Sequence, residues 1–150
     1  MPLDVRAIDF VGYDSRGEVV LLAEAKARRG TSISWAAELR KNILSHGTLP
    51  ESQFFLIVTP DRIYVWKGRA QGENERWPDA VLNAEEILAP YLHRIGRSAG
   101  ELGGEAFEYV VLYWLAELSI SRPDVVADER LRDSGFLDAM KNVRIEHQGA

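Results

Sequence analysis

The 150-residue sequence contains no cysteine, and this absence restricts the chemistry open to the protein. Disulfide frameworks, thiolate zinc sites and cysteine nucleophiles are excluded, so any bound metal must be held by oxygen or imidazole ligands. No apolar run approaches the roughly 20 residues that a membrane-spanning helix needs. The first residues also lack the basic start and apolar core of a secretory signal. We therefore expect no membrane association and a cytoplasmic location.

The chain length suits one domain with a hydrophobic core, and the shares of hydrophobic (46%) and charged (27%) residues are those of a globular protein. The net charge of -5 argues against a protein that coats nucleic acid, because phosphate binding depends on clustered Lys and Arg. The acidic excess lies in residues 101–150. Basic residues of the first third either contact a phosphate backbone or form a solvated surface: Lys26, Arg28, Arg29, Arg40 and Lys41.

The first half of the sequence predicts a β-hairpin, a helix and two further strands. Two apolar segments rich in β-branched residues, 5–13 and 18–27, are separated by turn-forming residues and predict the hairpin. Apolar residues at helical spacing predict a helix over 34–46. The continuous apolar run 54–59 is typical of a strand buried on both faces, and the alternating run 63–67 predicts its partner strand.

The second half predicts helices and a domain boundary. Asn83 fits a helix N-cap and Pro90 fits the first turn of a second helix, so two short helices in tandem are expected. The glycines and serine of residues 96–104 indicate a flexible joint. This joint divides the chain into an α/β core of residues 1–97 and a helical C-terminal extension of residues 98–150.

Within that extension we expect an amphipathic helix at about 105–118. Its middle is apolar nearly all round, so this helix must bury two faces. It either lies between the core and the C-terminal tail or packs against a second subunit in a homodimer. A short helix over 134–140 and an edge strand over 143–147 follow, and the polar residues 68–78 predict a surface loop.

The hairpin places ionisable residues in otherwise apolar strands. If the two residues after Asp14 form the loop, Asp9 lies opposite Leu22, and Glu24 is its diagonal neighbour on the same face. Side chains two apart on a strand share a face, so Lys26 joins them. Diagonal partners lie within about 8 Å, and three charged side chains are therefore expected on one patch.

Two neighbouring carboxylates repel each other, and this pattern predicts a cation site. Lys26 neutralises them in part, whereas a hard divalent ion such as Mg²⁺ or Mn²⁺ prefers oxygen ligands and does so more fully. The expected metal ligands are Asp9, Glu24 and the carbonyl of Ala25. Lys26 would then orient or activate a water molecule and stabilise charge on a phosphoryl oxygen. The reaction class that fits is phosphodiester hydrolysis.

A hairpin with Asp9 on its first strand and Glu24-Ala25-Lys26 on its second, followed by a helix and a buried strand, resembles the PD-(D/E)xK (restriction-endonuclease-like) superfamily of nucleases. The resemblance covers residues 5–67, although Ile8 stands where the family motif has proline. It implies an α/β fold with a mixed β-sheet flanked by helices. It also implies a metal-dependent catalytic site of Asp9, Glu24 and Lys26 that hydrolyses nucleic acid, with DNA as the expected substrate.

The sequence departs from the family before the motif. Family members have a further helix and strand there, and that helix often supplies an acidic ligand, but only eight residues precede Asp9. Either the sequence begins inside the domain, or C-terminal elements or a second subunit complete the sheet and the site. Glu105 and Glu108 then take the acidic role, or they are solvated residues of a helix face. Glu38 stands where some members carry an auxiliary polar residue.

Other readings of these residues remain open. The charged patch could be a surface salt-bridge cluster on an open sheet face. The chain could also be an inactive module that binds nucleic acid or a protein, or a subunit of a restriction or defence system. The three histidines have no metal-ligand spacing, so structural or surface roles are expected for them. Three of the four tryptophans are expected in packed interiors rather than stacked on bases: Trp35, Trp66 and Trp114.

Overall fold

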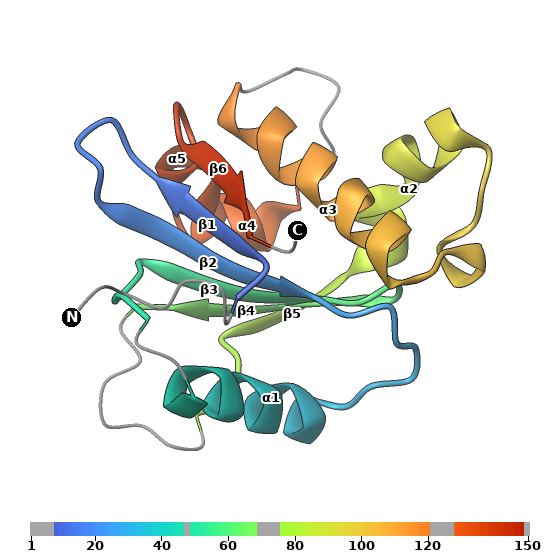
Figure 1. Ribbon diagram of the computed structural model, residues 1–150, viewed down its shortest axis with the longest axis horizontal. Coiled ribbons are helices and arrows are strands. Elements are labelled where there is room, and N and C mark those ends of the chain that lie inside the picture. The colour runs from blue at the N-terminus through green and yellow to red at the C-terminus, as the bar shows by residue number, and fades with distance from the viewer. Residues whose placement is uncertain (1–7, 47–48, 69–75, 121–127, 149–150) are drawn as a thin grey trace.

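The computed structural model describes residues 8–46, 49–68, 76–120 and 128–148. These residues form a six-stranded sheet in the order β5-β4-β3-β2-β1-β6 (Figure 1). Strands β2 and β3 pair in parallel, whereas the other neighbouring strands pair antiparallel. The expected mixed α/β sheet is thus confirmed. Its strands are β1 (Phe10–Tyr13), β2 (Val19–Ala25), β3 (Phe54–Val58), β4 (Arg62–Lys67), β5 (Ala80–Asn83) and β6 (Arg144–His147).

Helices cover both faces of the sheet (Figure 1). Helix α1 (Ile33–His46) lies on one face, where its side chains join a core with Val11, Leu22 and Trp66. The larger core lies on the opposite face, beneath the remaining helices. These helices are α2 (Ala84–Ile95), the 3₁₀ turn η2 (Ala99–Glu101), α3 (Gly104–Ser119), α4 (Glu129–Asp133) and α5 (Phe136–Ala139).

Strand β3 shows why the continuous apolar run is buried on both sides. All five of its residues are buried. Leu56 and Val58 belong to the core under α2 and α3, whereas Phe55 and Ile57 belong to the core under α1. Alternating side chains of one strand therefore fill both cores, as the sequence predicts for a central strand.

The boundaries after residue 76 differ from the prediction. Strand β5 and helix α4 are additional elements. The two expected tandem helices form one helix, α2, because Pro90 lies inside it without ending it. Proline leaves the carbonyl four residues earlier unpaired. That carbonyl belongs to Glu86, an exposed residue, so water can satisfy it. The beginning of the expected first hairpin strand, residues 5–7, lies outside the described residues.

The C-terminal third is part of the same sheet and core. Strand β6 pairs with β1, and α3 contacts α2, β2 and β6. The core on this side includes Phe107, Trp114 and Val143 together with Leu21, so it spans the predicted boundary near residue 98. Helix α3 therefore lies between the sheet and the C-terminal tail, which is one of the two arrangements that its apolar pattern allows. No helix in the part of the chain that the structure describes is long and apolar enough to cross a membrane.

Candidate functional site

The register of the hairpin differs from the expected one by two residues. Phe10 pairs with Ala23, whereas the predicted register places Leu21 opposite it. The turn is one residue longer than expected, because the Asp14 N–H donates to the Glu18 carbonyl, and an irregularity beside Gly12 adds a second residue. The predicted pairing of Asp9 with Leu22 is therefore wrong.

This error leaves the expected grouping of side chains intact. The period of a strand is two, so a shift by two residues returns every side chain to its own face. In the observed register Phe10 pairs with Ala23, so extending the antiparallel pairing by one residue places Asp9 opposite Glu24. The two acidic residues are thus direct neighbours rather than diagonal ones.

Two backbone hydrogen bonds join Asp9 to the end of β2. The Asp9 N–H donates to Oε1 of Glu24 at 3.0 Å, and the Ala25 N–H donates to Oδ2 of Asp9 at 2.9 Å. Lys26 Nζ lies 3.3 Å from Oε2 of Glu24. The three residues predicted from the sequence therefore converge where β2 ends.

Burial makes Glu24 the unusual member of this group. Its exposed fraction is 7%, and burial raises the pKa of its carboxyl to about 7. The negative charge of Asp9 contributes to the raised pKa, whereas the positive charge of Lys26 opposes it. A carboxyl with this pKa exchanges its proton near neutral pH, and a cation that binds there competes with that proton.

Two residues from the C-terminal third join the group. Burial raises the pKa of Glu108 on α3, and so do the charge of Asp9 and a side-chain hydrogen bond with it. His147 Nε2 on β6 lies 3.3 Å from Oε2 of Glu108. The Gln148 N–H donates to the Asp9 carbonyl at 2.7 Å, which fixes the end of β6 beside Asp9.

The sequence singled out Glu108 as a candidate but gave His147 no such role. Of the two acidic candidates on α3, Glu105 lies exposed in the first turn, and Glu108 is the one beside Asp9. The sequence feature that could have identified His147 was its position in a predicted edge strand. Nothing local in the sequence says that this strand pairs with β1.

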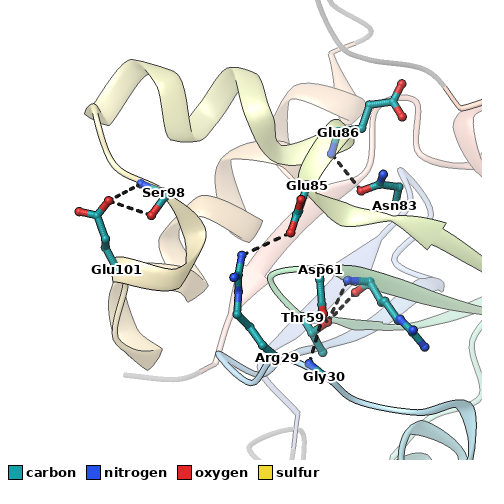
Figure 2. A network of polar contacts seen from close by, with 10 residues as sticks. Arg29, Gly30, Thr59, Asp61, Asn83, Glu85, Glu86, Ser98 and Glu101 are labelled. Atoms are coloured by element: carbon teal, nitrogen blue, oxygen red, sulfur yellow. Dashed lines mark hydrogen bonds and ion pairs between the residues drawn. The ribbon is translucent and has the colours of Figure 1, made fainter.

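The loop after Lys26 contacts neighbouring elements near the ends of β2 and β3 (Figure 2). Arg29 forms an ion pair with Glu85 of α2 at 3.3 Å. The Gly30 N–H donates to Oδ2 of Asp61 at 3.2 Å, and Thr59 Oγ1 donates to the other oxygen of Asp61 at 3.0 Å. These contacts fix the path of the loop that leads from the charged group to α1.

Arg29 also lines a cavity of about 630 Å³ beside α2. His93 and Arg97 line the same cavity, and Glu85 is its acidic member. Nearer to α1, Arg28 lies exposed with its guanidinium 5.6 Å from the ring centroid of Trp35. These basic side chains are accessible to a phosphate backbone.

Arg40 does not lie on the surface that the sequence suggests for it. Its exposed fraction is 1%, and its guanidinium lies over the rings of Phe55 and Trp66, at 5.7 and 5.4 Å from their centroids. A buried cation over aromatic rings stabilises the core under α1 and cannot reach a phosphate backbone. Its neighbour Lys41 is half-buried, and Glu38 is exposed on α1. Of these three residues, only Arg40 is excluded from surface contacts.

The residues at the end of β2 fit a hard cation. Asp9 and Glu24 offer carboxylate oxygens, and the Ala25 carbonyl faces the same side as the N–H that donates to Asp9. Among the described residues no group of three or more Asp, Glu or His side chains is arranged to hold a metal ion. Two carboxylates and a backbone carbonyl nevertheless suit Mg²⁺, which keeps several of its own waters.

Comparisons of the chain with protein-family models, with curated proteins and with solved structures gave no match.

Proposed function

We propose that this chain hydrolyses phosphodiester bonds in nucleic acid with the help of Mg²⁺ or Mn²⁺, and that DNA is its substrate. One observation carries the proposal: the buried carboxyl of Glu24, whose pKa is raised to about 7, lies directly against Asp9 and 3.3 Å from Lys26. Perturbed carboxyls beside a lysine are typical of sites that bind cations and move protons.

Each residue has a distinct part in the proposed reaction. Asp9, Glu24 and the Ala25 carbonyl hold the cation, whose charge stabilises the negative charge that develops on the phosphoryl oxygens. The Lys26 side chain is 44% exposed, so its ammonium can reach a bound substrate. There it orients the attacking water and donates a hydrogen bond to a phosphoryl oxygen. Its ion pair with Glu24 fixes the ammonium beside the cation site.

The arrangement of elements also supports the resemblance to PD-(D/E)xK nucleases. After the hairpin, α1 crosses over to a parallel strand, β3. We take α3 and β6 as counterparts of the helix and strand that family members have before the motif: β6 pairs with β1, and α3 contacts β2 and β6. Glu108 on α3 supplies the additional acidic side chain beside Asp9.

Calorimetric titration with Mn²⁺ and Mg²⁺ tests the proposal first. We expect binding that Asp9→Ala and Glu24→Ala abolish and that Glu105→Gln, an exposed acid on α3, leaves unchanged. Cleavage assays on duplex, branched and single-stranded DNA and on RNA follow, with Lys26→Ala as the inactive variant. Wild-type protein that binds neither ion would contradict the proposal.

A second candidate function is a catalytically inactive module that binds nucleic acid or a partner protein, for example as a subunit of a restriction or defence system. One observation favours it: Lys26 and two backbone N–H groups already accompany the carboxylates of Asp9 and Glu24. This group is therefore held together without a cation. Binding of DNA in the presence of EDTA, with no cleavage when Mn²⁺ is added, would identify this function.

A further inference from the structure

His147 is held in one orientation by the aromatic side chains around it. Its ring stacks on Phe10, with centroids 4.9 Å apart and an angle of 20° between the planes. The ring of Tyr109 meets it edge-on at 5.7 Å. Phe10 and His147 are also backbone partners in the β1–β6 pair, so ring and strand are fixed together.

The fixed ring presents one nitrogen to the acidic group. Nε2 lies 3.3 Å from Oε2 of Glu108, and both side chains are mostly shielded from solvent, with exposed fractions of 17% and 19%. With its proton on Nε2, the imidazole donates to that oxygen. The carboxyl of Glu108 in turn lies beside that of Asp9, where a proton shared between the two contributes to the raised pKa of Glu108. A chain of contacts therefore runs from β6 through α3 to the start of β1.

We propose that His147 is a positioning residue, which holds Glu108, and through it Asp9, in the orientation that cation binding requires. The inference rests on the proposed function. Asp9 has two acidic neighbours, Glu24 and Glu108, and when these side chains are ionised, as cation binding requires, their repulsion favours conformations in which they turn apart. The hydrogen bond from His147 keeps Glu108 directed toward Asp9. Glu108 touches the ligand residue Asp9 rather than the ion, and such partners typically change metal affinity 10- to 100-fold; His147 acts through Glu108.

The test compares two substitutions of His147 in the full chain. His147→Phe keeps an aromatic ring that can stack on Phe10 but removes the donor to Glu108. His147→Gln removes the ring and keeps an amide donor that can reach the same oxygen. We expect the Kd for Mn²⁺, measured by calorimetry at one pH, to rise about 10-fold or more in His147→Phe and by much less in His147→Gln.

Glu108→Ala probes the same contact from the other side and serves if a His147 variant fails to fold. It should weaken Mn²⁺ binding, and adding His147→Phe to it should weaken binding little further, because each change removes the hydrogen bond between these two side chains. Additive effects in the double variant would contradict the inference.

The remaining outcomes separate this inference from the proposed function. If Asp9→Ala abolishes Mn²⁺ binding while His147→Phe binds as the wild type does, the role of His147 is wrong and the proposed function stands. If His147→Gln weakens binding as much as His147→Phe does, a hydrogen-bond donor at this position does not preserve the site, and the inference is also wrong. If the wild-type chain binds no Mn²⁺, both proposals are wrong.

Discussion

Replacing Glu24 by glutamine should remove a specific pH dependence from the stability of the metal-free protein. Glu24 has an ordinary pKa of 4.5 when unfolded and one of about 7 in the folded chain, where burial is the main cause. Each tenfold change in proton affinity corresponds to roughly 1.4 kcal/mol, so the ionised carboxyl costs the folded state about 3 kcal/mol. Glutamine keeps the shape of the side chain and cannot ionise.

The sign follows from the protons bound in each state. Between pH 4.5 and pH 7 the folded chain holds the Glu24 proton more firmly than the unfolded chain does, so its stability falls as pH rises. This stabilising contribution is fully present below pH 4.5 and is lost as pH rises through about 7. The stability of Glu24→Gln relative to the wild type should therefore increase over this range by up to about 3 kcal/mol.

Urea unfolding in EDTA at several pH values between 4 and 8 measures this difference, with tryptophan fluorescence as the signal. Titrating groups far from Glu24 cancel, because they are present in both proteins with the same surroundings. Glu38→Gln, an exposed position on α1, is the matched control and should follow the wild type at every pH. Parallel curves for Glu24→Gln and the wild type would show that burial of Glu24 does not govern its ionisation, and the reasoning would fail.

Three further predictions concern the fold. Arg40→Ala should lower the free energy of unfolding, measured by urea denaturation, by roughly 2 to 4 kcal/mol, because it empties a buried site over two aromatic rings. Lys41→Ala should change the free energy of unfolding little. Equal effects of the two substitutions would contradict the burial of Arg40. Gly12→Val should lower the free energy of unfolding by about 1 to 3 kcal/mol, since a Cβ there would lie 2.9 Å from Cγ1 of Val143. A melting temperature unchanged from that of the wild type would refute this prediction. Asn83→Ala should cost about 1 kcal/mol through loss of the α2 N-cap, and circular dichroism during thermal unfolding measures it.

The hairpin shows how far local pattern reaches. The sequence predicted both strands and the shared face of Asp9 and Glu24, and that face survived an error of two residues in register. It survived because the longer turn and the irregularity beside Gly12 shift the register by one residue each, and a total shift of two residues returns every side chain to its own face. The register itself was mispredicted, because the turn is one residue longer than expected and the pairing has an irregularity between Gly12 and Tyr13.

The sequence alone determined that Glu24 and Lys26 lie on one face, since the alternation of side chains along a strand is a local property of the chain. The tertiary structure decided what surrounds them. Glu108 lies beside Asp9, and His147 beside Glu108, only because β6 pairs with β1 and α3 covers the sheet. Arg40 is buried because α1 turns it toward Phe55 and Trp66. Such contacts follow from the burial of apolar surface between distant elements, which no short stretch of sequence specifies.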